Sequence, residues 1–265
     1  MMDKLIFGRY VTGDSLIHRL DPRAKLLSTL LFVVIIFLAN NWLTYLGLAL
    51  FVGLGIYLSD IKLSFFINGV KPLIWLILFT VLLQVIFTAG ENVLFSWWVI
   101  VISKEGLVNG AFIFMRFVLI IFMTTLLTLT TMPMSLTEAI EYLLHPGKKI
   151  GVPVHEIALM LSIALRFVPT LMDETEKIMN AQRARGIDFG EGNLYNQMKS
   201  IVPMLIPLFV SSINRAEELA TAMEARGYKG GQGRTKFRQL TWQRRDTYLL
   251  GIYLAMTIFL IIFRT

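Results

Sequence analysis

The sequence contains no cysteine and only 3 histidines in 265 residues. Without cysteine there is no disulfide framework, no thiolate zinc or iron–sulfur site and no thiol nucleophile, and so few histidines leave little for another metal centre. Charged residues are also scarce, at 16% of the chain, while 55% of the residues are apolar. This balance is unusual for a soluble domain and typical of a membrane protein.

Sequence motifs for nucleotide binding and catalysis are missing as well. The chain has no Gly-x4-Gly-Lys-[Ser/Thr] sequence, so it carries no phosphate loop with which to bind and hydrolyse a nucleotide. Its long apolar segments contain no histidine and no pair of acidic residues that could act as acid and base. We therefore expect no enzyme, and no catalytic, cofactor-binding or metal-binding residue in this chain.

Five segments are long and apolar enough to be membrane spans, which need about 20 residues. They cover approximately 24–39, 42–58, 65–88, 106–131 and 246–263. Pro72 is expected to kink the third, since proline removes a backbone hydrogen-bond donor. The predicted fold class is an all-α integral membrane protein of about five transmembrane helices with an additional block of three helices.

The basic residues set the orientation of the spans. The N-terminal 25 residues carry five of them, and positively charged flanks stay on the cytoplasmic side of a membrane. With the N-terminus cytoplasmic, only Lys104 and Arg264 fall in the predicted outer segments. The net charge of +7 thus follows the membrane topology and does not call for a nucleic-acid partner. We expect a multi-pass protein of the inner (cytoplasmic) cell membrane, in contact with the lipid bilayer.

The remaining block covers residues 132–245, between the segments 1–131 and 246–265. We expect three helices here, at about 135–144, 154–185 and 194–226, the first opened by a capping box of Ser135 and Glu138. The two long helices each begin apolar and become charged. Two further spans are an alternative, but they would place several basic residues outside, so helices at or under the inner membrane face are favoured.

An internal repeat lies at the C-terminal ends of these two long helices. At an offset of 41 residues, Asn180-Ala-Gln-Arg-Ala-Arg-Gly186 aligns with Thr221-Ala-Met-Glu-Ala-Arg-Gly227. Helix capping is the simplest explanation for the final Arg-Gly pair, because glycine favours the left-handed position after a helix and arginine complements the helix dipole. Capping does not explain the alanines.

The alanines recur one turn apart at equivalent places, Ala181 with Ala184 and Ala222 with Ala225. Small residues on one face allow a helix end to enter a groove, where an arginine can pair with a carboxylate. Two similar helix ends then imply two similar grooves. The spacing therefore predicts a docking role for both.

The pattern resembles one family, the transmembrane T component (EcfT) of energy-coupling factor (ECF) transporters and its CbiQ-like cobalt-transport relatives. The resemblance covers nearly the whole chain and is strongest in the paired Ala-Arg-Gly ends. Supporting segments are His18-Arg-Leu-Asp-Pro-Arg-Ala-Lys-Leu26, Thr131-Met-Pro-Met-Ser-Leu-Thr-Glu138, Leu165-Arg-Phe-Val-Pro-Thr170 and Ala222-Met-Glu-Ala-Arg-Gly-Tyr228.

This resemblance implies a non-catalytic scaffold of an ABC-type importer. Two partner ATPase subunits would bind ATP and Mg²⁺, and an integral-membrane S component would bind a vitamin or a metal ion and move when the ATPases move. The implied ATPase-docking residues are Ala184, Arg185, Gly186, Ala225, Arg226 and Gly227, supported by Ala181 and Ala222.

Two other classes of function remain as alternatives. A self-contained secondary transporter would need ion-coupling carboxylates at mid-membrane and usually inverted repeats. An integral-membrane enzyme would need reactive side chains gathered near one face. Neither pattern is visible in the sequence, so the coupling scaffold is the favoured interpretation.

Overall fold

The computed structural model describes residues 10–88, 92–97, 100–151, 153–187, 189, 194–230 and 240–264. The chain forms two compact units. The bundle unit comprises Met1–Ala139 and Gln239–Thr265, and the paired-helix unit comprises Ile140–Arg238. Their boundaries lie a few residues inside the block 132–245 proposed from the sequence.

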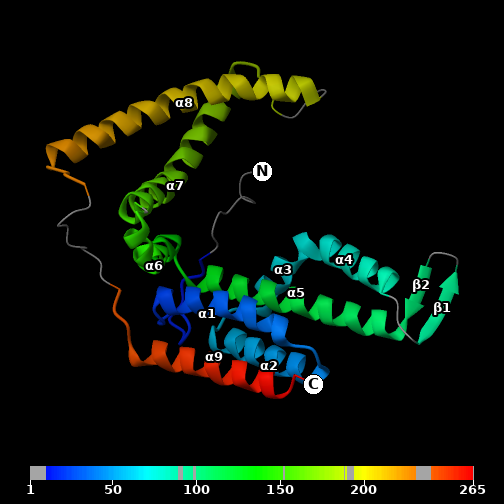
Figure 1. The fold of residues 1–265 in the computed structure, drawn as a ribbon. Coiled ribbons are helices and arrows are strands. Elements are labelled where there is room, and N and C mark those ends of the chain that lie inside the picture. Colours follow the sequence, from blue (N-terminus) through cyan, green and yellow to red (C-terminus); the bar gives the residue numbers. More distant parts are fainter. Residues whose placement is uncertain are drawn as a thin grey trace. The chain divides into compact units, whose positions relative to one another are not determined.

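The bundle unit consists mainly of apolar helices that match the predicted spans (Figure 1). They are α1 (Pro22–Ile35) with the short 3-10 turn η2 (Ile36–Leu38), α2 (Trp42–Leu58), α3 (Leu63–Val70), the turn η3 (Lys71–Leu73), α4 (Ile74–Phe87), α5 (Lys104–Thr130) and α9 (Arg244–Ile262). Pro72 lies in η3, which interrupts the third predicted span at the place of the expected kink. The all-α membrane class is confirmed.

Polar residues at the helix ends set where these helices begin. Asp21 caps α1 by accepting a hydrogen bond from the backbone N–H of Arg23 at 2.8 Å, and Pro22 occupies the first helical position. Ser103 accepts from the N–H of Gly106 at 3.0 Å at the start of α5. These caps satisfy backbone groups that the first turn of a helix leaves free.

Helix α5 is the centre of the bundle unit. It contacts α1, α2, α3 and α4, while α1 also contacts α9. Phe32, Tyr45, Phe66 and Leu126 are among the buried side chains of this core. At Gly110 an added Cβ would come within 2.9 Å of a Val85 methyl group, so glycine permits the close approach of α4 and α5.

The outward faces of the same helices are apolar and exposed. Trp75 is 80% exposed and Phe87 is 77% exposed, and Leu50 and Phe79 are also exposed. So many exposed large apolar side chains are unusual on a soluble monomer and are suited to lipid or to a membrane partner. The surface and the long apolar helices together support a multi-pass membrane protein.

A short hairpin was not predicted. Between α4 and α5, strands β1 (Val93–Trp97) and β2 (Ile100–Ser103) pair in antiparallel fashion, and β2 contacts both helices. This segment follows the third predicted span and was expected to lie on the outer side of the membrane, with no strands predicted in it. Its run of β-branched and aromatic residues favours strand pairing.

The paired-helix unit holds the two long helices that carry the repeat (Figure 1). α6 (Pro133–Leu144) crosses the boundary between the units and is followed by the turn η4 (His145–Ile150), α7 (Val154–Ala184) and α8 (Leu194–Ala225). These bounds confirm the three predicted helices. The predicted capping box is wrong, because α6 begins at Pro133 and Ser135 lies inside it.

Several described helices have the length and composition of membrane spans. Among the residues that the structure describes, α3 to α4 (Leu63–Phe87), α5, α7 and α9 are long and apolar enough to cross a membrane, and α2 is a shorter apolar helix. Helix α7 is thus compatible with both sequence-based interpretations. Its placement along the inner membrane face stays a prediction.

Candidate docking site

The first candidate site is the C-terminal end of α7, called here the first tip. It consists of Ala181, Ala184, Arg185 and Gly186. Gly186 has a φ of 87°, the left-handed region that favours glycine, and its N–H donates to the carbonyl of Arg183 at 2.9 Å. The N–H of Ile187 donates to the carbonyl of Gln182 at 3.1 Å. This pair of bonds is the Schellman motif.

The C-terminal end of α8, the second tip, repeats this geometry. It consists of Ala222, Ala225, Arg226 and Gly227. Gly227 has a φ of 73° and donates to the carbonyl of Glu224 at 2.8 Å, and the N–H of Tyr228 donates to the carbonyl of Met223 at 3.0 Å. Each bond has its equivalent 41 residues earlier, so the two tips share a backbone conformation as well as a sequence.

Both tips are open to solvent. The two alanines, the arginine and the glycine of each tip are exposed, whereas Gln182 between them is buried. No atom lies within 4 Å of the place that a Cβ would take on Gly186 or Gly227. Capping therefore explains the glycines, whereas the alanines are exposed and no contact among the described residues accounts for their small size.

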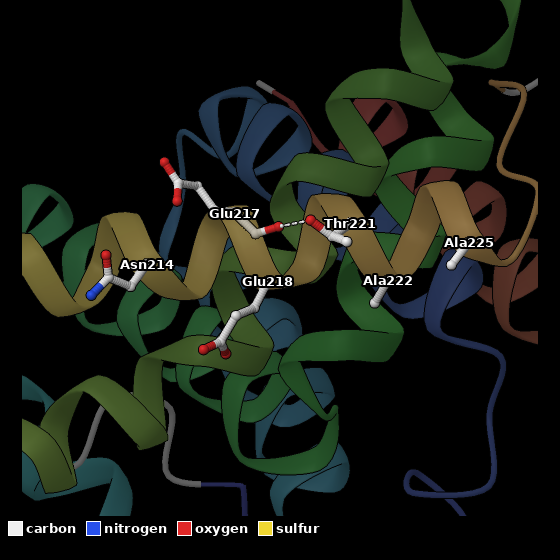
Figure 2. A pocket seen from close by; sticks show the side chains of 6 residues that line it. All are labelled: Asn214, Glu217, Glu218, Thr221, Ala222 and Ala225. Atoms are coloured by element: carbon white, nitrogen blue, oxygen red, sulfur yellow. Dashed lines mark hydrogen bonds between the residues drawn. The ribbon is translucent and has the colours of Figure 1, made fainter.

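An open recess lies along the last turns of α8 (Figure 2). It is lined by Asn214, Glu217, Glu218, Thr221, Ala222 and Ala225. Glu218, Ala222 and Ala225 point to the same side of the helix in Figure 2, as residues four and seven apart do on one helix face. The alanines of the second tip thus leave space that larger side chains would fill, which is the shape a docking surface needs.

A polar cluster joins the two long helices where they cross. Glu174 of α7 accepts a hydrogen bond from the Ser211 hydroxyl and forms a salt bridge with Arg215 at 2.9 Å, both on α8. The guanidinium of Arg215 also lies over the ring of Phe167, 5.8 Å from its centroid. These residues were not among the sequence-based candidates, although the repeat gives a signal: at the offset of 41, Glu174 aligns with Arg215.

The contacts show that α7 and α8 run antiparallel. Glu174 meets Arg215, while further along α7 the side-chain amide of Gln182 donates to the carbonyl of Pro203 at 3.2 Å. Arg226 lies 23 residues beyond Pro203, which is roughly 35 Å of helix at about 1.5 Å per residue. The two tips are therefore at opposite ends of the pair.

An apolar groove separates the helices on one side of this crossing. Its volume is about 230 Å³. The apolar lining side chains include Ile163, Phe167, Leu171, Leu219, Ala220 and Met223. On the other side of the crossing, the Gln182 side chain links the helices through its hydrogen bond to the carbonyl of Pro203.

A second polar cluster holds three elements of the bundle unit together. Asp246, at the start of α9, is 1% exposed and accepts hydrogen bonds from the N–H groups of Asp21 and Gln243, both at 2.8 Å. Arg23 reaches the carbonyl of Leu240 at 3.2 Å. Asp21 and Asp246 are 225 residues apart in sequence, so no local pattern could have found this contact.

Lys25 adds the C-terminus of α5 to the same cluster. It is buried, and its ammonium group donates to the carbonyl of Thr130 at 2.9 Å and to that of His18 at 3.1 Å. The cation also complements the negative end of the α5 dipole. Thr130 is the last residue of α5 before the chain continues into α6. Lys25 therefore holds the C-terminal end of α5 against the start of α1.

Arg116 is a charged residue in the middle of the fourth predicted span. Its guanidinium lies over the ring of Phe37, 5.0 Å from the centroid, and close enough to Tyr45 for an electrostatic interaction. The observed neighbours are aromatic, which compensates a partly buried cation in part.

The described residues contain no group of three or more histidine, cysteine, aspartate or glutamate side chains that could hold a metal ion. The two tips are exposed to solvent and repeat both the same sequence and the same backbone conformation. The class that the fold and these features define is an all-α membrane protein with two exposed, identically capped helix ends.

The comparisons with known proteins agree with this class. The family model CbiQ, described as "Cobalt transport protein", matches residues 13–237, so the chain belongs to the CbiQ family. It is 61% identical over 263 residues to the energy-coupling factor transporter transmembrane protein EcfT of Lacticaseibacillus paracasei, covering 99% of this chain and 100% of the relative.

Two further relatives carry the same name. The protein of Lactococcus lactis subsp. cremoris is 60% identical over 261 residues, covering 98% of both chains, and that of Bacillus subtilis is 52% identical over 264 residues, covering 100% of both. The relatives are named as transporter components and not as enzymes. The predicted family and the general function, a membrane component of an ECF transporter, are confirmed.

Proposed function

We propose that this chain is the coupling scaffold of an ECF importer, with each tip seated in a groove of one ABC-type ATPase subunit. Arg185 and Arg226 pair there with carboxylates, while the alanines and glycines of the tips fit the groove walls. ATP and Mg²⁺ are bound by the ATPases and not by this chain. Movement of the ATPases is passed through α7 and α8 to a membrane-embedded S component.

The observation that carries this proposal is the repetition of one exposed tip. Both long helices end in the same Schellman motif, with exposed alanines, arginine and glycine at equivalent positions. A single cap would need only the glycine. A repeated surface of small residues beside an arginine fork is what two related partner grooves require.

The antiparallel crossing fits a pair of docked subunits. The tips are separated by roughly 35 Å of α8 at about 1.5 Å per residue, which leaves room for a separate subunit at each end. Glu174, Ser211 and Arg215 link the helices between the tips. A displacement at one tip therefore reaches the crossing through a continuous, hydrogen-bonded helix.

The apolar surfaces support an S component as the third partner. The groove between α7 and α8 and the exposed apolar faces of the bundle unit offer surface to a membrane protein. The transported vitamin or metal ion would be held by that partner.

The topology required is a cytoplasmic N-terminus in the inner cell membrane, with both tips in the cytoplasm. Positive flanks support this orientation, since Lys148, Lys149, Lys177 and Lys199 then all lie on the inner side. Helix α7 lies at the inner face in this arrangement. Its charged second half, which leads to the first tip, remains in water.

The test is the double variant Arg185→Glu with Arg226→Glu. Each change replaces attraction to a groove carboxylate by repulsion, and losing one buried charge pair at an interface costs about 2–5 kcal/mol. We expect co-purification of both ATPases to be lost and substrate uptake to be abolished, while membrane insertion is unchanged. The matched control is Arg264→Glu, which changes an exposed arginine near the C-terminus. This control variant should retain both ATPase co-purification and substrate uptake. Undiminished co-purification with the double variant would refute the proposal.

A further inference from the structure

The two tips share a shape but differ in charge. Residues 176–186 and 217–227 align at the offset of 41 and include the two tips. The first stretch has one acidic and three basic residues, a net charge of +2, and the second has three acidic and one basic residue, a net charge of −2. The tip arginines are retained, so the reversal comes from two other positions.

The first reversed position is Lys177, which aligns with Glu218. Both side chains are exposed. At about 100° per residue, positions four and seven residues further along a helix lie within about 40° of the starting one. Glu218 therefore shares the face of Ala222 and Ala225, which Figure 2 shows directly, and Lys177 has the same relation to Ala181 and Ala184.

The second reversed position, Arg183 aligned with Glu224, lies elsewhere on the helix. It is about 120° away from the first position by the same arithmetic. Arg183 also interacts within the chain, donating to the Asn180 side chain at 3.5 Å and lying over the Phe189 ring at 5.9 Å. Only the first reversal is thus presented on the face with the small residues.

We infer that Lys177 and Glu218 determine which ATPase subunit each tip binds. This inference rests on the proposed docking function and adds its specificity. Lys177 would face an acidic rim beside one ATPase groove, and Glu218 a basic rim beside the other. Exchanging the tips would bring like charges together at both grooves, which disfavours the wrong orientation of the scaffold. The shared alanines and arginines would provide docking to either ATPase, and the opposite charges of Lys177 and Glu218 would determine which ATPase each tip binds.

The cysteine-free chain allows a direct measurement. Asn180→Cys and Thr221→Cys place a single thiol at equivalent exposed positions beside the two tips. Each thiol is labelled with a photoactivated cross-linker in the full complex with both ATPases, and the captured subunit is identified by mass. We expect each position to capture a different ATPase with a preference of about tenfold or more, since a few exposed charge pairs together contribute about that factor.

The decisive variant exchanges the charges, Lys177→Glu with Glu218→Lys. We expect the preference at both positions to fall by about tenfold or to invert. The matched control makes the same reversal on the other face, Arg183→Glu with Glu224→Arg, and should leave the preference unchanged. An unaltered preference in the first exchange, an equal change in the control, or equal capture of both ATPases by the unexchanged chain would overturn the inference.

Failure of the docking proposal is separable in the same assay. If the Arg185→Glu and Arg226→Glu variant still captures both ATPases as the parent does, the tips are not docking sites and both proposals fail. If capture is lost in that variant while the charge exchange has no effect, docking stands and only the assignment of specificity to Lys177 and Glu218 is wrong.

Discussion

The two units of this protein differ in how much of their surface they bury. The bundle unit has an extended core around α5 and buries charged residues with their partners, as at Asp246 and Lys25. In the described part of the paired-helix unit, only Val154, Ala158 and Gln182 are buried. Large apolar side chains of α8, such as Phe209, are exposed.

The difference in burial implies that the two units have different sources of stability. Burial of apolar surface is the main favourable term in folding, so the bundle unit has its own source of stability within the membrane. Two crossed helices with few buried side chains gain little stability from burial of their own apolar surface. The paired-helix unit is therefore expected to depend on other subunits and on the membrane for much of its burial, as a coupling element would.

The largest effect on this comparison is expected from Asp246→Ala in the bundle unit. The change leaves the buried N–H of Asp21 and the partly buried N–H of Gln243 without an acceptor, at a cost of about 2–5 kcal/mol. Thermal unfolding of the purified chain in detergent should show a clearly lower midpoint. Asp14→Ala, at an exposed position, is the control and should have little effect. An unchanged midpoint for Asp246→Ala would show that this cluster does not hold the bundle together.

A smaller effect is expected at the crossing of the paired-helix unit. A double-mutant cycle of Glu174→Ala and Arg215→Ala should give a coupling of about 1 kcal/mol, because the salt bridge is only partly buried. Local opening free energies from hydrogen exchange in α7 and α8 provide the measurement. A cycle of Asp173→Ala with Arg215→Ala should give nearly zero, and equal coupling in the two cycles would contradict a specific link through Glu174.

An effect of similar size, but confined to the last helical turn, is expected at the tip glycines. Gly186→Ala and Gly227→Ala meet no neighbouring atom, so the only cost is the left-handed backbone, about 1 kcal/mol. Hydrogen exchange in the last helical turn should accelerate about fivefold, the factor that corresponds to this free energy.

Gly251→Ala is the matched control for the tip glycines. Gly251 also has open space around it but lies inside α9, where alanine is the better helix former. It should be neutral or slightly stabilising. Acceleration of exchange by the control to the same extent would show that the tips are not held by their caps.

The sequence predicted those features that depend on local pattern. Hydropathy located α2 to the residue and α5 and α9 to within two residues, and Pro72 marked the interruption at η3. The repeat predicted two helix ends with left-handed glycines, and the positive φ of Gly186 and Gly227 confirms them. Glycine after a helix is a local signal, so spacing alone was sufficient.

Features that depend on long-range contact were missed. The bond between Asp21 and Asp246 joins residues 225 positions apart, and hydropathy gives no information on such pairing. The hairpin β1–β2 was not predicted, because a short apolar run between two spans does not by itself distinguish a strand from other structures. The salt bridge of Glu174 with Arg215 could have been anticipated, since opposite charges at aligned positions of two antiparallel helices can meet at their crossing.

The most direct test of the central claim is thiol labelling of the tips in membrane vesicles. In the cysteine-free chain, Ala184→Cys and Ala225→Cys each place one small thiol on a docking face. The account predicts labelling by a membrane-impermeant maleimide from the cytoplasmic side only, and protection of both thiols when the two ATPases are bound. Labelling from the external side, or equal labelling with and without the ATPases, would contradict it.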